Sequence, residues 1–288
     1  MKKDKLYLRQ YEPGCVPVRP VEITNVFTMF LRCCRKPFIF AGELHEQWEL
    51  VYVRSGEATF TVDDKVYRLG AGSLIFHRPM EFHQIHAEHT ELEIFVTSFH
   101  MTGGEVRKFE QSIFELSSGE KTVMEELIRQ CCALNEGYYT DGEFGDCRPF
   151  WQAKPLEFYA CVHGLERLFC MLLQRSPTLQ PPKETADSLL YRNIAAVLEE
   201  HAYGDITIAQ VADRCGVSPS TVKTCFHRHA GCGLHKYFLK IKMRTAVQLI
   251  REGHSVSHVS DELGFNNPNY FTYVFRRETG KRPTDFRV

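Results

Sequence analysis

A duplicated helical unit near the carboxyl end constrains the fold of this chain more than any other feature. Ile208–Val217 and Val256–Phe265 carry apolar residues at the same helical positions, 48 residues apart, and each segment contains a late glycine. One additional residue enters the second turn, so the offset becomes 49, and Ser218-Pro219 then matches Asn267-Pro268. A Ser or Asn cap followed by proline marks a helix start. Each copy is therefore predicted to fold as helix, turn, helix.

Glycines mark the turns and the ends of both predicted units. Gly216 and Gly264 lie in the turns, where glycine supplies a left-handed backbone conformation that other residues resist. Gly231 and Gly280 are placed to end the second helix of each copy. This is the layout of a helix-turn-helix, whose second helix can lie in a DNA major groove. One copy would be weak evidence, but two copies with matched caps, turns and ends indicate a DNA-binding domain.

The outward faces of the two second helices are the candidate DNA-binding surfaces. At about 100° per residue, Val222 and Phe226 point inward in the first copy, and Phe271 and Phe275 do so in the second. The opposite faces carry short polar or basic side chains, which hydrogen-bond base edges and phosphates. A solvated helix face is polar in any case, but the coincidence in both copies favours DNA contact. The predicted DNA-binding residues are Ser220, Lys223, Thr224, His227, Arg228, Asn269, Thr272, Tyr273, Arg276 and Arg277.

At its carboxyl end the chain resembles the AraC/XylS family of transcription regulators, over about residues 189–288. The resemblance rests on Leu263-Gly264-Phe265, Tyr270 to Arg277, Gly280-Lys281-Arg282-Pro283 and Phe286-Arg287. It implies that a helix from about Gly233 to Arg251 links the two units rigidly. The reading helices would then enter successive major-groove segments about one helical turn (~34 Å) apart. The family's base-reading positions fall on Ser220, Lys223, Thr224, Asn269, Thr272 and Tyr273.

Length, composition and cysteine usage point to two globular domains in a reducing compartment. A chain of 288 residues suggests two domains, and 43% apolar residues can fill their cores. No apolar run approaches the ~20 residues of a membrane span, and none follows the basic start. The 11 cysteines include two adjacent pairs, Cys33-Cys34 and Cys131-Cys132, and no CxxC spacing. Reduced thiols and a cytoplasmic location are therefore expected.

Charge is distributed unequally between the two halves. From Leu189 onward there are 14 Lys and Arg against 9 Asp and Glu, whereas the preceding residues have 21 against 27. A basic carboxyl-terminal domain after an acidic amino-terminal one is consistent with nucleic-acid contact by the former. The imbalance is modest and supports the motif.

The amino-terminal part is predicted to be a small antiparallel β-barrel within about Pro37 to Met101. Short strands separated by turn signals are typical of such barrels. The region resembles a cupin-type barrel, the sensor domain of many members of the same family. The fold class is thus α+β with two domains: a cupin-like barrel with a helical pair, then an all-α domain of two helix-turn-helix units. The expected boundaries are 1–175 for the sensor, 176–188 for the linker and 189–288 for the DNA-binding domain. The predicted strands are Glu49–Arg54, Ala58–Val62, Val66–Leu69, Ser73–Phe76 and Leu92–Phe99.

A barrel of this size can enclose one small ligand. Cupin enzymes hold a metal with His-x-His-x3–4-Glu and a later His, and here Glu43 replaces the first of these histidines. Resemblance to the regulators implies a metal-free pocket for an organic effector, so no metal and no cofactor is expected. Glu43, His45, Glu49 and His83 remain the alternative metal-ligand set. The predicted effector-binding residues are His45, Trp48, Glu49 and His83, and the alternative role for the two histidines and Glu49 is structural hydrogen bonding.

Two amphipathic helices are predicted after the barrel, Gly119–Asn135 and Pro155–Gln174. Stripes such as theirs commonly pack on their own domain. The family resemblance implies that this helix pair forms the contact of a homodimer. Tyr138–Phe150 is predicted to be a loop, and the proline-rich Ser176–Thr185 a semi-stiff linker.

The leading functional hypothesis is a transcription regulator that binds DNA and responds to a small-molecule effector. The resemblance favours activation and a homodimer, with RNA polymerase as a further partner, and it implies no enzymatic activity. One alternative is a metal-dependent cupin enzyme fused to a DNA-binding domain. Another is a thiol-based redox sensor that uses the vicinal cysteines, although no basic residue is spaced to activate Cys131 or Cys132.

Overall fold

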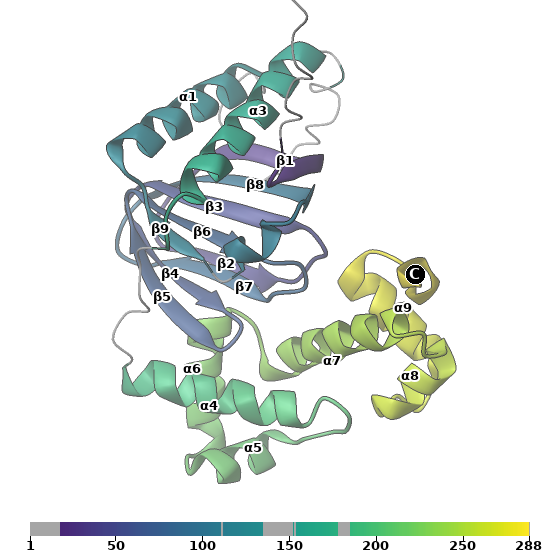
Figure 1. Ribbon diagram of the computed structural model, residues 1–288. Helices are drawn as coiled ribbons and strands as arrows, with labels where there is room; N and C mark the ends of the chain where they lie inside the picture. The colour runs from purple at the N-terminus through teal and green to yellow at the C-terminus, as the bar shows by residue number, and fades with distance from the viewer. Residues whose placement is uncertain (1–17, 111, 135–151, 153, 178–184, 288) are drawn as a thin grey trace, which may run out of the picture.

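An amino-terminal sheet domain is followed by a carboxyl-terminal helical domain, as Figure 1 shows. The computed structural model describes residues 18–110, 112–134, 152, 154–177 and 185–287. The predicted α+β fold with two domains is confirmed. Among the described residues, no helix has both the length and the apolar composition needed to cross a membrane.

Two antiparallel sheets form the amino-terminal domain. The strand orders are β1-β8-β3-β6-β9 and β2-β7-β4-β5, and a cluster of apolar residues fills the space between the sheets. The predicted strands are confirmed as β3, β4, β5, β6 and β8, whereas β1, β2, β7 and β9 were not individually predicted. The first sheet consists of β1 (Glu22–Cys34), β8 (Leu92–Thr102), β3 (Trp48–Ser55), β6 (Ser73–His77) and β9 (Ile113–Glu115). The second consists of β2 (Phe38–Glu43), β7 (His83–Ala87), β4 (Glu57–Val62) and β5 (Lys65–Gly70).

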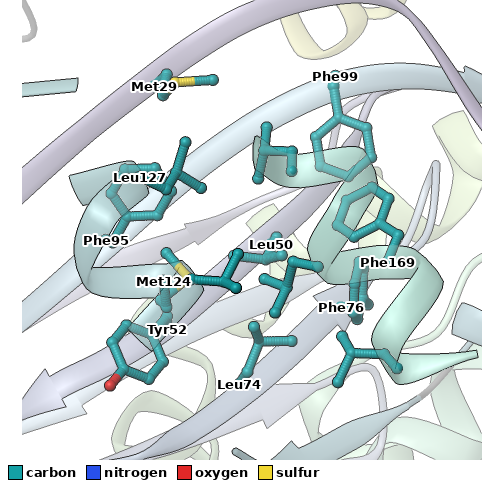
Figure 2. Packing of buried hydrophobic residues seen from close by; sticks show 14 of the residues in the cluster. Met29, Leu50, Tyr52, Leu74, Phe76, Phe95, Phe99, Met124, Leu127 and Phe169 are labelled. Atoms are coloured by element: carbon teal, nitrogen blue, oxygen red, sulfur yellow. The ribbon is translucent and has the colours of Figure 1, made fainter. Parts of the chain in front are cut away.

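Helices α1 (Ser118–Leu134) and α3 (Pro155–Leu172) cover the outer face of the first sheet. Figure 2 shows Leu50 and Phe95 of the sheet packed with Met124 of α1 and Phe169 of α3. A short 3-10 helix, η1 (Val106–Phe109), adds Phe109 to this core. Both helices were predicted within two residues of their bounds. The predicted loop Tyr138–Phe150 lies outside the described residues. The predicted stripe on α1 is buried and comprises Val123, Leu127, Cys131 and Leu134.

The carboxyl-terminal domain contains the two predicted helix-turn-helix units. Ser218 caps α6 by accepting from the Thr221 amide, and Asn267 caps α9 in the same manner. Gly216 and Gly264, in the two turns, adopt positive φ angles of 67° and 73°. The elements are α4 (Ala186–Glu200), α5 (Ile208–Cys215), α6 (Pro219–Ala230), α7 (Leu234–Arg251), α8 (Val256–Glu262), α9 (Pro268–Thr279) and η2 (Pro283–Phe286).

Helix α4 begins earlier than expected, inside the region 176–188 assigned to the linker. The Thr185 hydroxyl accepts from the Ser188 amide, and the Ser188 hydroxyl accepts from the Thr185 amide. This reciprocal cap satisfies two amides at the helix start, so the helix begins at Ala186. Its first turn belongs to the DNA-binding domain rather than to a flexible connection.

Helix α7 contributes to the cores of both helix-turn-helix units. Tyr237 and Phe238 pack in the first core, and Met243 and Val247 pack in the second. The buried Lys242 ammonium donates to Asp205 Oδ1 and to the carbonyl of Leu263, both at 2.9 Å. The two units are thus held to one helix by apolar packing and by a shared cation.

Besides apolar contacts such as that of Phe82 with Tyr237, two barrel segments make hydrogen bonds and ion pairs with the helical domain. At the β4–β5 turn, the Asp63 carbonyl accepts from the Tyr191 hydroxyl at 2.7 Å and the Tyr237 hydroxyl at 3.3 Å. The Asp63 carboxylate accepts from Arg244 at 2.7 Å. We call this set the hairpin contact. It ties the barrel to α4 and α7 of the first unit.

The second connection comes from the segment between β2 and β3. Glu46 pairs with Arg251 of α7 and with Lys281, which follows α9, both at 2.6 Å. Leu44, in the same segment, packs in the core of the second helix-turn-helix unit with Met80 of the barrel. We call this set the loop contact. It joins the barrel to the second unit.

Candidate DNA-binding surface and effector pocket

The outward face of α6 is exposed along its length. Its inward residues Val222 and Phe226 are fully buried, so the predicted inward face is confirmed. The predicted DNA-binding residues of this helix are all exposed and comprise Ser220, Lys223, Thr224, His227 and Arg228. A continuous polar face of this kind can enter a groove without removing core side chains.

Arg228 differs from its neighbours because its guanidinium already has a partner. It donates to Asp187 Oδ2 of α4 at 2.7 Å, and the same oxygen accepts from His229 at 2.8 Å. Burial tends to raise the pKa of Asp187, but the hydrogen bonds from Arg228 and His229 lower it overall. A phosphate contact by Arg228 would therefore compete with this ion pair.

Four of the five predicted residues on α9 are exposed, namely Asn269, Tyr273, Arg276 and Arg277. Thr272 is half-buried, and its hydroxyl donates to the Pro268 carbonyl at 2.9 Å. Arg277 pairs with Glu278 and lies over the Tyr273 ring at 5.9 Å. Thr272 is thus the least available of this set for a polar DNA contact.

Both reading helices end at the barrel and begin away from it. A Cβ at Gly231, directly after α6, would lie 3.3 Å from Ala41 Cα of the barrel. Lys281, directly after α9, pairs with Glu46 of the loop contact. Figure 1 shows α6 running away from the β-sheets toward α5. Its 12 residues span about 18 Å, so its first turns are distant from the barrel.

A cavity of about 330 Å³ opens between the two sheets of the amino-terminal domain. Its volume is at the lower end of the range for small-molecule sites. Aromatic and aliphatic side chains dominate the lining. The lining residues are Phe27, Thr28, Phe30, Arg32, Phe38, Phe40, Glu43, His45, Gln47, Glu49, Ile85, Ile94, Val96 and Ser98.

Trp48 does not line this cavity, which corrects its predicted role as an effector-binding residue. Successive residues of a strand point to opposite faces of the sheet. Glu49 and Val51 of β3 face the space between the sheets, whereas Trp48 and Leu50 pack under α1 and α3. Trp48 and Glu49 therefore lie on opposite faces of β3, with Trp48 in the core beneath the helices and Glu49 at the cavity.

The predicted residues His45 and Glu49 line the polar end of the cavity with Glu43, and the predicted residue His83, which does not itself line the cavity, lies behind them against both carboxylates. His83 Nε2 lies 3.3 Å from Glu49 and 3.5 Å from Glu43. His45 Nε2 lies 3.6 Å from Glu49 and 3.7 Å from Glu43. Glu49 and His83 are buried, while Glu43 and His45 are partly exposed. Four side chains from β2, β3, β7 and one connecting segment thus meet at one point.

Electrostatics couple these groups strongly. Burial tends to lower the pKa of His83, but the neighbouring carboxylates of Glu49 and Glu43 raise it overall. Burial tends to raise the pKa of Glu49, but the positive charge on His83 and the nearby His45 ring lower it overall. The ring of His77 stacks on His83 with centroids 4.4 Å apart. At this end of the pocket, carboxylates are therefore stabilised by positive charge that lies between them.

The pocket also contains residues that the sequence did not single out. Phe27, Phe30 and Arg32 come from β1, a strand that lies outside the predicted barrel region. Phe38 and Phe40 come from β2, where their alternation with the exposed Ile39 was the available signal. These side chains form most of the apolar wall.

The vicinal cysteines lie in environments that disfavour thiolates. Cys131 is buried and donates to the Met29 carbonyl at 3.3 Å, and Cys33 donates to Glu93 at 3.3 Å. Burial raises the pKa of Cys132, and raises that of Cys161 to about 11. Because the thiolate is the reactive form, the raised pKa values of Cys132 and Cys161 make these two thiols less reactive.

An apolar pocket in a β-domain, joined to paired helix-turn-helix units, defines an effector-responsive DNA-binding regulator. Residues 38–132 match the AraC-like ligand binding domain, and residues 211–288 match a helix-turn-helix domain. The chain belongs to the AraC/XylS family of transcription regulators.

The chain is similar to known proteins over most of its length. The HTH-type transcriptional activator RhaS of Escherichia fergusonii is 25% identical over 261 residues, covering 86% of this chain and 87% of RhaS. The HTH-type transcriptional regulator YfiF of Bacillus subtilis is 23% identical, covering 84% of this chain and 77% of YfiF. A crystal structure of fatty acid-bound ToxT from Vibrio cholerae aligns over 92% of this chain and 96% of ToxT, with 11% identity and a TM-score of 0.36.

Proposed function

We propose that this regulator is a transcription activator that inserts the first turns of α6 and α9 into successive major-groove segments. The observation that carries this proposal is the exposure of both outward faces on helices that begin away from the barrel. Lys223 and Asn269, in the first turns, are the side chains best placed to reach base edges. Arg276 and the other cations of the faces would contact phosphates. Activation is inferred from the similarity to RhaS, a transcriptional activator.

The regulator acts as a homodimer, and the two copies meet through the exposed side of α3. It acts in the cytoplasm, where its DNA lies, and contacts RNA polymerase there. Leu156 and Tyr159 on α3 are 80% and 60% exposed. Apolar side chains gathered on one exposed helix face are a common feature of protein interfaces. The barrel serves as a sensor rather than an active site, as in regulators of this organisation.

The effector is a small organic molecule with an apolar body, held by the aromatic wall and by His45, Glu49 and His83. The segment between β2 and β3 connects this pocket to the DNA-binding domain. Glu43 and His45 face the cavity, whereas Leu44 and Glu46 form the loop contact. A ligand that moves this segment changes the loop contact, and so shifts the arrangement of the two units.

Lys223→Ala is expected to weaken binding to the operator because it removes a cation from the exposed face of α6. If Lys223 contacts a base, the substitution should weaken binding to the operator by about 1–3 kcal/mol and leave binding to scrambled DNA unchanged. If it contacts a phosphate, binding to both duplexes should weaken equally. Fluorescence anisotropy with operator and scrambled duplexes over a salt series separates the two. Lys236→Ala, an exposed lysine of α7, is the control. Unchanged affinity for Lys223→Ala would contradict the assigned face.

Val96→Phe is expected to abolish the response to a pocket ligand, because it adds bulk to the wall of a 330 Å³ cavity. Ligands are first identified as organic molecules that raise the melting temperature of the wild-type protein. Ile39→Phe is the matched control, since Ile39 lies on the outer side of β2 and is 56% exposed. A melting-temperature rise that survives in Val96→Phe would place the ligand elsewhere.

A further inference from the structure

We propose that Glu43, His45, Glu49 and His83 form a binding site for one divalent first-row transition metal ion, such as Zn²⁺, at the polar end of the pocket. The site deepens the proposed function, because the metal would occupy the same pocket as the organic effector. It goes beyond the expectation from sequence that the barrel binds no metal. The four ligand atoms all lie within 4.8 Å of one another.

The histidine rings are oriented as metal ligands usually are. His45 Nδ1 lies 3.1 Å from the Gln47 carbonyl, and His83 Nδ1 lies 3.1 Å from the Glu81 carbonyl. A carbonyl oxygen only accepts, so each Nδ1 must carry the hydrogen, and each Nε2 of a neutral ring presents a lone pair. A backbone acceptor on the other ring nitrogen is the outer-shell arrangement that fixes a metal-binding tautomer.

The Nε2 atoms are left without hydrogen-bond partners although both rings are largely buried. His83 is 1% exposed, and its Nε2 makes no hydrogen bond; the same holds for His45 Nε2. Both atoms point toward carboxylate oxygens of Glu43 and Glu49. Lone pairs facing carboxylates in a buried site repel one another unless a cation lies between them.

The distances between the histidine nitrogens and the carboxylate oxygens indicate whether the cation between these groups is a proton or a metal ion. A charge-assisted N–H···O bond is about 2.7–2.9 Å long, shorter than the four N···O distances of 3.3, 3.5, 3.6 and 3.7 Å. Ligands about 2.1 Å from a tetrahedral metal are separated by roughly 3.4 Å. The observed spacing therefore matches atoms around a common metal better than a set of ion pairs.

The mixed donor set selects the class of metal. Imidazole favours zinc, copper, iron and nickel, whereas Mg²⁺ and Ca²⁺ prefer sites built only from oxygen ligands. A second cluster, Asp187, Cys225 and His229, also meets the distance criterion among the described residues. Its Asp187 oxygen already accepts from Arg228 and His229, so its charge is neutralised without a metal.

Metal binding would join β2, β3 and β7 to the segment that carries the loop contact. Glu43 and His45 flank Leu44, and Glu46 follows directly. A metal held by Glu43 and His45 would therefore fix the position from which Leu44 and Glu46 reach the second helix-turn-helix unit. In this way the metal would set the strength of the loop contact.

The test is titration of the full-length, chelator-treated protein with Co²⁺ and Zn²⁺, followed by visible absorption for Co²⁺ and calorimetry for both. One equivalent should bind, with the absorption of a low-symmetry, protein-bound Co²⁺ ion, and Mg²⁺ should not compete. His45→Gln and His83→Gln should each lower the affinity by more than the roughly 10–100-fold that loss of an outer-shell partner causes. His86→Gln, on β7 but outside the cluster, and His229→Gln, in the second cluster, should bind as the wild type does.

Stoichiometric binding that His45→Gln and His83→Gln both leave unchanged would overturn the proposal, as would no binding by the wild-type protein. Loss of binding in His229→Gln alone would assign the metal to the other cluster. Circular dichroism identifies any variant that fails to fold. If His83→Gln fails to fold, His45→Gln still tests the proposal, because His45 is partly exposed. Operator affinity of the metal-free protein is measured separately, so absence of a metal leaves the proposed DNA-binding function standing.

Discussion

Phe275→Ala should lower the free energy of unfolding by about 3–5 kcal/mol, the range observed for truncating a buried phenylalanine. Phe275 is fully buried on α9, with its ring 5.7 Å from Phe271 and 5.2 Å from Phe286. The core of the second unit is small, so little surrounding structure can collapse into the cavity left behind. A denaturant titration followed by far-UV circular dichroism measures the loss.

Tyr273→Ala is the matched control on the same helix. Tyr273 is 61% exposed and lies on the outward face, so its removal should change stability by less than about 0.5 kcal/mol while weakening operator binding. The two variants thus separate the inward face from the outward face by two independent measurements. Wild-type stability for Phe275→Ala, or normal operator binding by Tyr273→Ala, would mean that the faces of α9 are assigned wrongly.

The helical domain was largely predictable from sequence because its signals are local. Ser218-Pro219 and Asn267-Pro268 fix helix starts within a few residues, and the repeated apolar spacing fixes the buried faces. The start of α4 was missed although its signal was also local. Thr185 and Ser188 form the reciprocal cap, but the preceding prolines directed attention to a linker.

The pocket was only partly predictable because β3, one of the strands that line it, is buried on both faces. In β3 every residue from Trp48 to Val53 is buried, so no alternation of polar and apolar residues shows which side faces the cavity. Glu49 was identified from its place in a motif, whereas Trp48 was assigned to the wrong face. Strand β1 escaped prediction because two register irregularities, near Ile23 and Val26, interrupt its alternation.

The contacts between the domains could not be inferred from sequence at all. Tyr191 and Tyr237 each reach Asp63 across more than 120 residues of chain, and Lys281 reaches Glu46 across 235. Asp63 reads as an ordinary turn residue, and Glu46 as a surface carboxylate. Only the packing of one domain on the other gives these residues partners, and no local pattern encodes that packing.

Glu46→Lys is expected to uncouple the pocket from DNA binding. The Glu46 side chain is 12% exposed and accepts from Arg251 and Lys281 at 2.6 Å, so the substitution places a cation against two others. Like charges about 4 Å apart repel by roughly 1–4 kcal/mol under these conditions. Allosteric coupling typically amounts to about 1–3 kcal/mol, so loss of this contact can remove it.

The measurement is the ratio of operator affinities with and without a ligand found by the thermal-shift screen. In Glu46→Lys this ratio should approach one, while the ligand and the operator each still bind. Adding Arg251→Glu and Lys281→Glu to Glu46→Lys reverses all three charges and should restore part of the ratio. Glu91→Lys makes the same charge change at an exposed barrel position and should keep the wild-type ratio. An unchanged ratio in Glu46→Lys would show that coupling passes through other contacts between barrel and helices, among them the hairpin contact at Asp63.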